Sequence, residues 1–235
     1  MGLDVYAGPL TRYYSGTWQT ILQQSAAETG MTIEVVYSHG QPKWPRPKRA
    51  RKLVLSLRDS LNRHLAAHLT RPLDWPEDPE GRYFTDKPAW DCYGSLLLWA
   101  AHNEHPNLPH PERALQDWTK DPAFAASMSP DFHTSYPSLL LNVEFWIPGD
   151  ADFTFRAPDP FGNETTFGFT APLLRELEVL NANTWGASGG TISAWRHRGA
   201  EHLAPFEISA QFGFAVLYQV ARDAVSACLP VRLDY

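Results

Sequence analysis

Five residues near the start of the sequence have side chains that binding surfaces commonly use. They bring one carboxylate, one guanidinium and three phenols into a short stretch: Asp4, Tyr6, Arg12, Tyr13 and Tyr14. Tyr and Arg often anchor protein interfaces, and the loop after a strand often presents binding groups. Tyr rings also pack well in a core while the hydroxyl reaches a polar partner. The segment therefore indicates a binding surface, with a structural use for some of its rings.

Histidines occur at helical spacing in two places. The pairs are His102 with His105, near Glu104 and His110, and His64 with His68. Side chains three or four residues apart share a helix face and can share a metal ion. Neither pair completes a zinc motif, because Leu follows the first His of the second pair and Pro106 ends the helix after the first pair. We therefore expect packed or helix-terminal histidines, with no metal and no other cofactor.

Cys92 is a candidate nucleophile, since any of the 9 histidines could serve as its base. Asp91 beside it could orient that base or act as an acid. Catalytic sites are assembled from separated loops, so a hydrolase site built from Asp4, Asp91, Cys92 and either His102 or His105 is the alternative that we keep. No flanking signature accompanies Cys92, and a lone cysteine among apolar residues is usually part of the core.

Seven Lys and Arg residues crowd into residues 43–58, in a Pro-interrupted loop that runs into a helix. Taken alone, this cluster is typical of a phosphate-binding patch, and Trp44 could stack on a base. The formal net charge is nevertheless -6, and an acidic loop at 74–86 follows the helix. We therefore expect the cluster to pair within the fold or to face solvent, and we expect no nucleic-acid partner.

Length and composition are those of a globular protein. A chain of 235 residues with 43% hydrophobic and 20% charged side chains can bury a core, and we expect one domain over residues 1–235. The 9 Trp and 20 Pro indicate long ordered loops held by packed rings. Two cysteines in apolar surroundings, no signal sequence and no apolar run of roughly 18 to 20 residues predict a cytoplasmic protein outside the membrane.

The pattern of apolar residues predicts a mixed α+β fold. Strands are expected at 3–7, 33–37, 143–147, 153–156, 165–169 and 229–235, with 159–163 as a hairpin turn. Helices are expected at 17–29, along the leucines from 53 to 69, at 95–102, near 111–118, at 171–181 and at 206–227. Loops are expected at 11–16 and 71–91. These elements give a central, mostly antiparallel or mixed sheet of about six strands with five or six helices and long Pro- and Trp-rich loops.

Short segments resemble known bacterial proteins. The opening Met-Gly-Leu-Asp-Val-Tyr, residues 10–14 and residues 90–94 are similar to a group of bacterial cytosolic proteins without an assigned activity, a match that extends over most of the chain. The opening also resembles that of some immunity proteins, which neutralise polymorphic bacterial toxins. This second resemblance implies a cytosolic protein that binds one cognate toxin, and the acidic charge is compatible with a basic toxin domain.

We therefore expect a non-enzymatic binding protein of the immunity type, which meets a basic protein partner with exposed aromatic rings and carboxylates. Its binding residues would be Asp4, Tyr6, Arg12, Tyr13, Tyr14, Trp90, Asp91 and Tyr93. The hydrolase stays as the alternative, and a phage-associated or other host-interaction protein is not distinguished from the first hypothesis. A deep pocket with convergent carboxylates or histidines would favour the enzyme, whereas an aromatic surface patch would favour the binding protein.

Overall fold

A computed structural model describes residues 3–33 and 44–235 of the chain. Within these ranges the structure has nine α-helices, one short 3-10 helix and six strands. The strands are β1 (Asp4–Ala7), β2 (Phe84–Asp86), β3 (Phe145–Ile147), β4 (Phe155–Pro158), β5 (Glu164–Phe169) and β6 (Val231–Asp234). The helices are α1 (Leu10–Tyr14), α2 (Ile21–Glu28), α3 (Pro47–Leu65), α4 (Trp90–Glu104), α5 (Pro122–Ser127), α6 (Pro137–Leu140), α7 (Thr170–Asn183), α8 (Gly189–Arg198), α9 (Phe206–Ala227) and the 3-10 helix η1 (Trp118–Lys120).

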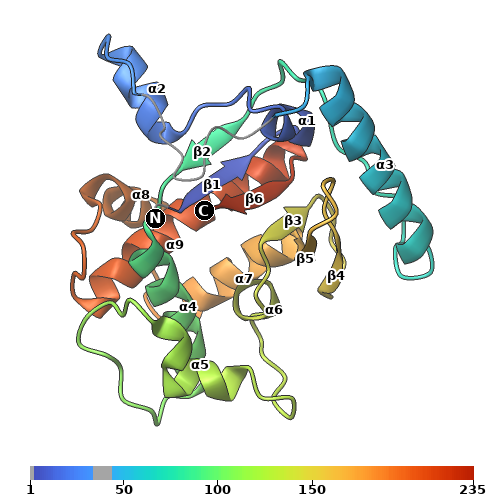
Figure 1. Ribbon diagram of the computed structural model, residues 1–235. Helices are drawn as coiled ribbons and strands as arrows, with labels where there is room; N and C mark the ends of the chain where they lie inside the picture. The colour runs from blue at the N-terminus through green and yellow to red at the C-terminus, as the bar shows by residue number, and fades with distance from the viewer. Residues whose placement is uncertain (1–2, 34–43) are drawn as a thin grey trace.

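The six strands form one sheet in the order β2-β1-β6-β3-β5-β4 (Figure 1). Neighbouring strands are antiparallel except β3 and β5, which run parallel with Phe145 opposite Phe167. On β1, Val5 lies opposite Asp86 of β2 and opposite Leu233 of β6. The predicted α+β class and the mostly antiparallel, six-stranded mixed sheet are therefore confirmed.

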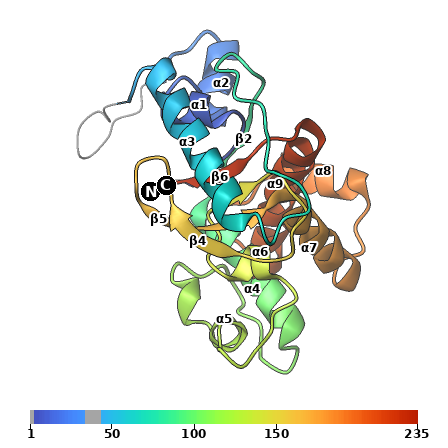
Figure 2. The same cartoon turned by 90° about the vertical axis from the view of Figure 1, so that its right-hand side faces the viewer.

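The sheet separates two hydrophobic clusters, because successive side chains of a strand point to opposite faces. Val5 and Trp146 belong to the cluster that α4, α7 and α9 cover. Tyr6 and Phe145, each one residue away along its strand, belong to the cluster that α1 and α3 cover. Figures 1 and 2 show α3 on the outside of the molecule with its N-terminal end beside α1, whereas α2 lies apart from α3 in Figure 1.

The longest helix, α9, is apolar on most sides and packs along α4. The two helices approach each other closely at Gly213, where a Cβ atom would overlap the carbonyl oxygen of Cys92. α9 stops at Cys228, whose backbone is left-handed (φ 54°), and Pro230 follows. Among the described residues, no helix combines the length and the apolar character that crossing a membrane requires.

Helix α3 is amphipathic, as its leucine spacing predicts. One face is buried against the fold and consists of Ala50, Val54, Leu57, Leu61 and Leu65. Its N-terminal half carries several cations on the other faces. The helix ends at Leu65, so the predicted row of leucines stops before Leu69.

Two elements form where the sequence predicts loops, and both depend on contacts between distant parts of the chain. The predicted aromatic loop at 11–16 contains α1, because the Glu77 carboxylate accepts the free backbone N–H groups of Leu10 (3.1 Å) and Thr11 (2.6 Å). The predicted loop at 71–91 contains β2, which pairs with β1. Neither contact is visible in the local pattern.

Helix boundaries differ from the prediction where a different residue supplies the cap. α2 begins at Ile21, after Thr20, which forms a capping box with Gln23, so it starts four residues later than the predicted 17. α4 begins at Trp90, five residues before the expected start. The helix expected near 111–118 is wrong, since η1 and the Asp121-capped α5 form further along the chain. The strand expected at 33–37 lies outside the described residues after Ile33.

Candidate functional site

The three tyrosines assigned to a binding surface are buried in the cluster that α1 and α3 cover. Tyr6, Tyr13 and Tyr14 have exposed fractions of 0%, 5% and 1%. The Tyr6 hydroxyl donates to the Pro9 carbonyl oxygen (3.0 Å), and the Tyr13 hydroxyl donates to Asp234 (2.5 Å). Burial raises the pKa of all three phenols well above the usual range. The expectation that these rings are exposed is therefore corrected: they are part of the core.

Arg232 on β6 is the centre of this buried polar network, which we call the Arg232 cluster (Tyr13, Tyr14, Asp159, Arg232 and Asp234). Its guanidinium donates to the Tyr14 hydroxyl and to Asp159 (3.4 Å), and lies over the rings of Tyr13 and Tyr14 at 5.1 and 5.2 Å. Burial raises the pKa of Asp234, although the Tyr13 hydrogen bond and Arg232 oppose the shift. The cluster thus joins α1, the β4–β5 turn and β6, with its charges satisfied inside the fold.

Arg12 and Asp4 also find partners within the fold. Arg12 donates to the Gly81 carbonyl oxygen (3.0 Å) and lies 4.2 Å above the Tyr83 ring. Asp4 is 8% exposed, and one carboxylate oxygen pairs with Lys87 (2.9 Å). Its other oxygen is buried without a hydrogen-bond partner among the described residues. Neither side chain is free to bind a partner in this arrangement.

Trp90 differs from the other candidates because it is exposed. Trp90 and Tyr235 are 38% and 59% exposed, and their ring centroids lie 5.4 Å apart. Tyr93, the third predicted aromatic of this segment, is buried behind Trp90, at a centroid distance of 6.3 Å. The Tyr235 hydroxyl donates to the Glu144 carboxylate, and burial together with Glu144 raises the pKa of Tyr235 to about 12. Trp90, Tyr235 and Glu144 therefore form one continuous surface, which we call the Trp90–Tyr235 surface.

Glu144 also lines a broad hollow of about 660 Å³ beside this surface. Its second oxygen accepts a hydrogen bond from the Thr165 hydroxyl (3.1 Å). Glu164 and Arg156 line the same hollow, and their charged groups lie 4.0 Å apart in exposed positions. The hollow thus offers two carboxylates and one cation next to a pair of exposed rings. Sequence reasoning missed Tyr235, because the alternation of the last strand places it on the core side with Val231 and Leu233.

Asp91 and Cys92 lie in the first turn of α4, where their contacts are structural. The Asp91 carboxylate accepts the backbone N–H groups of Cys92 (3.1 Å) and Leu203 (3.0 Å) and lies 3.2 Å from His202. Cys92 is 1% exposed. Burial and the neighbouring Asp91 raise the pKa of the Cys92 thiol to about 12. A thiol that stays protonated is a poor nucleophile.

His102 and His105 lie at the opposite end of the same helix. Ten residues of α-helix separate Cys92 from His102, which corresponds to a rise of about 15 Å. His102 stacks on His110 (4.6 Å between centroids) and lies 3.3 Å from Asp121, whereas His105 packs on a phenylalanine ring. The structure therefore does not bring the alternative catalytic set together. Within residues 3–33 and 44–235, no three potential metal ligands form a group.

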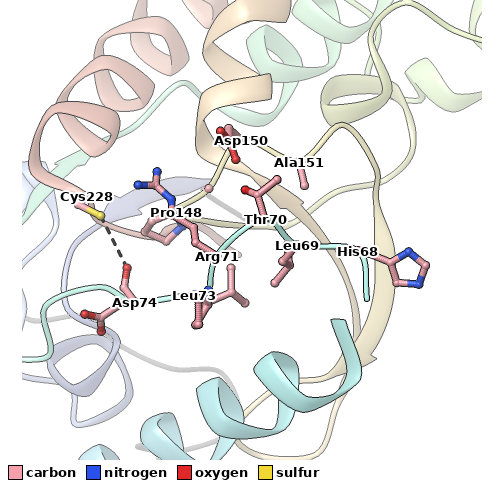
Figure 3. Close-up of a pocket in the computed structure, with 12 residues that line it drawn as sticks. His68, Leu69, Thr70, Arg71, Leu73, Asp74, Pro148, Asp150, Ala151 and Cys228 are labelled. Atoms are coloured by element: carbon pink, nitrogen blue, oxygen red, sulfur yellow. Dashed lines mark hydrogen bonds between the residues drawn. The ribbon is translucent and has the colours of Figure 1, made fainter. Parts of the chain in front are cut away.

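A cavity of about 440 Å³ lies between the α3–β2 connection, the β3–β4 connection and the end of α9 (Figure 3). Its lining includes Arg71, Asp150 and the exposed thiol of Cys228, none of which was predicted as a site residue. The thiol points toward the Asp74 carbonyl oxygen at 3.7 Å, while His68 points away from it (Figure 3). No hydrogen bond from a described histidine or carboxylate reaches this thiol, so the cavity has no activated nucleophile.

Comparison with known proteins leaves the function to be argued from this geometry. No protein-family model matches the chain, and no curated protein or solved structure matches it either.

Proposed function

We propose that the chain is a binding protein of the immunity type, which neutralises a basic protein partner by direct contact at the Trp90–Tyr235 surface. One observation carries the proposal: two large aromatic rings, Trp90 and Tyr235, are exposed and lie against each other at 5.4 Å. Exposed apolar rings are costly in water, and Trp and Tyr are the usual anchors of protein interfaces.

The charges around the rings favour a basic partner. Aromatic faces attract Lys and Arg side chains, and the Glu144 carboxylate, which accepts the Tyr235 hydroxyl, lies beside the rings and lines the adjoining hollow. The adjoining hollow of about 660 Å³ is wide enough to admit side chains of a partner, and because Arg156 offsets Glu164 there, Glu144 supplies its net negative charge. The formal net charge of -6 acts in the same direction, because it accelerates encounter with a positively charged protein.

The hydrolase hypothesis receives no such support. Asp91 is occupied by backbone N–H groups, Cys92 is buried and protonated, and His102 lies about 15 Å further along α4. A binding protein needs only a surface, and the Trp90–Tyr235 surface supplies one.

Site-specific photocrosslinking tests the proposal. A benzophenone amino acid at position 235 should crosslink one basic protein in cells that express the chain natively, and the same probe at the exposed Val179 on α7 should not. With the purified partner, Trp90→Ala should weaken binding by about 30-fold, since central aromatic anchors contribute roughly 2 kcal/mol or more. Val179→Ala should leave the affinity unchanged.

Two results would overturn the proposal. One is that position 235 crosslinks no basic protein. The other is that Trp90→Ala binds the crosslinked protein as tightly as the wild type does.

A further inference from the structure

Five cations are exposed at the N-terminal end of α3. We call this set the basic patch: Arg46, Lys48, Arg49, Arg51 and Lys52. Lys48 and Lys52 lie four residues apart and share one helix face, with Arg49 and Arg51 on either side. The buried face of the helix, which begins at Ala50, lies opposite. The patch therefore covers the whole outer surface of the first turns of α3.

None of these five side chains forms an ion pair or a side-chain hydrogen bond within residues 3–33 and 44–235. The remaining described cation of the 43–58 cluster, Arg58, pairs with Asp74 (2.6 Å). Residues 34–43 add one Glu and one Lys to the sequence, so their formal charges cancel. Arg58 therefore pairs within the fold and the five patch cations face solvent, which are the two outcomes expected from the sequence.

Asp74 of the acidic loop pairs with Arg58, and two further acidic residues of that loop, Glu77 and Asp86, are engaged away from the patch. Glu77 accepts N–H groups of α1 and of Trp75. Asp86 pairs with Arg196 (2.6 Å). One of the two reasons for expecting no nucleic-acid partner, intramolecular neutralisation of these cations, is thereby removed.

The cations of the basic patch destabilise the N-terminal end of α3. The N-terminus of a helix is its positive end, where acidic side chains stabilise and cations destabilise. The first turn of α3 has no acidic residue and contains Lys48 and Arg49. Like charges four residues apart, such as Lys48 and Lys52, repel each other as well. A bound polyanion would relieve both repulsions.

Trp44 adds an aromatic surface beside the patch. Its indole ring packs over Gly16, since a Cβ atom there would overlap the ring, yet the side chain stays 40% exposed. Arg46 follows two residues later, so the exposed ring borders the cations. Alternating rings and cations are how proteins hold single-stranded nucleic acids, whose bases stack while the phosphates pair with Lys and Arg.

We propose that the basic patch and Trp44 bind single-stranded nucleic acid through its phosphates and one stacked base. An anionic membrane fits less well, because the apolar face of α3 is already buried in the fold and cannot enter a bilayer. The site is separate from the Trp90–Tyr235 surface and does not depend on the function proposed there.

Fluorescence anisotropy with labelled oligo(U) and oligo(dT) of about 20 nucleotides tests the proposal. With five phosphates neutralised, the slope of log affinity against log salt should be about -3.5, so affinity should fall about 100-fold between 50 and 200 mM salt. Trp44→Ala should weaken binding of the single strand by about tenfold and leave binding of a duplex of the same length unchanged. The oligo(U) and oligo(dT) arms show whether the strand is RNA or DNA.

A charge-matched pair of variants separates the patch from the net charge. Reversing Lys48, Arg49, Arg51 and Lys52 to Glu should abolish binding. Reversing four exposed arginines elsewhere should leave affinity within about threefold, because phosphate pairing is local. These control positions are Arg63, Arg71, Arg198 and Arg222.

Three results would overturn the proposal. They are no oligonucleotide binding by the wild type at 50 mM salt, equal losses in the two quadruple variants, and tighter binding to phosphatidylglycerol vesicles than to either oligonucleotide. The last result would assign the patch to a membrane surface.

Discussion

The Arg232 cluster and the basic patch both place cations beside aromatic rings, and α1, which contributes Tyr13 and Tyr14 to the cluster, packs against α3, which carries the patch. In the cluster, Asp159 has a side chain only 1% exposed, and Arg232 has two phenols and a carboxylate as partners. In the patch, five cations have no partner within the described residues. Cations beside aromatic rings therefore stabilise the fold in the Arg232 cluster and remain available to a ligand in the basic patch. The two regions differ in whether groups of the same chain pair with the cations.

Removing the guanidinium at the centre of the cluster should have the largest effect. Arg232→Ala would leave Asp159 buried without a cation, which typically costs about 3–5 kcal/mol of unfolding free energy. Urea denaturation followed by circular dichroism measures the loss. Arg156→Ala removes an exposed arginine that lies 4.0 Å from Glu164, and it should cost less than about 1 kcal/mol. Similar losses of unfolding free energy for the two variants would contradict the expected difference between an arginine that is bonded inside the fold and an exposed one.

Glu176 is a buried carboxylate without a cation partner among the described residues, and it should make the free energy of unfolding depend on pH. Glu176 is 8% exposed and accepts the Ser138 N–H (2.8 Å), and burial raises its pKa to about 7. The pKa of Glu176 is higher in the folded state than in the unfolded state. At pH values between the two pKa values the folded state therefore binds more protons, so the free energy of unfolding falls as the pH rises from about 4.5 to about 7.

Glu176→Gln should remove this dependence. The wild type should lose on the order of 3 kcal/mol relative to the variant across that pH window, because each unit of pKa shift corresponds to about 1.36 kcal/mol. Urea midpoints measured at intervals between pH 4.5 and 7.5 give the two profiles. Parallel profiles would contradict a raised pKa for Glu176 in the folded state.

The smallest expected effect is a gain in the free energy of unfolding. Replacing Lys48 and Arg49 by Glu should raise the free energy of unfolding by about 0.5–1 kcal/mol, because acidic side chains suit the first turn of a helix. Thermal denaturation at low salt measures the gain, and added salt should reduce it. A loss of stability in this double variant would mean that the two cations support the fold after all.

The fold was predictable where a local pattern decides it. The buried Leu57, Leu61 and Leu65 of α3, the hairpin around residues 159–163 and the apolar α9 follow from periodicity and turn chemistry. α1 and β2 were not predictable, since one needs Glu77 from a distant loop and the other needs β1 as a partner.

The candidate site was predictable only in part, for a related reason. Trp90 was named from the sequence and is exposed, but Tyr13 and Tyr14, which have equally suggestive side chains, are buried. Residue type reports which bonds a side chain can form, whereas the choice between an internal and an external partner is made by tertiary packing. The basic patch shows the same limit, because two acidic residues of the 74–86 loop, Glu77 and Asp86, bond to other parts of the fold.

Urea denaturation with and without oligonucleotide tests most directly whether the basic patch is an open site. A ligand that binds only the folded state stabilises it, by about 2.7 kcal/mol at a concentration 100 times its dissociation constant. At 50 mM salt, a saturating concentration of whichever of oligo(U) and oligo(dT) binds more tightly should therefore raise the urea midpoint of the wild type and leave that of the variant with Glu at positions 48, 49, 51 and 52 unchanged. An unchanged midpoint for the wild type would contradict the account.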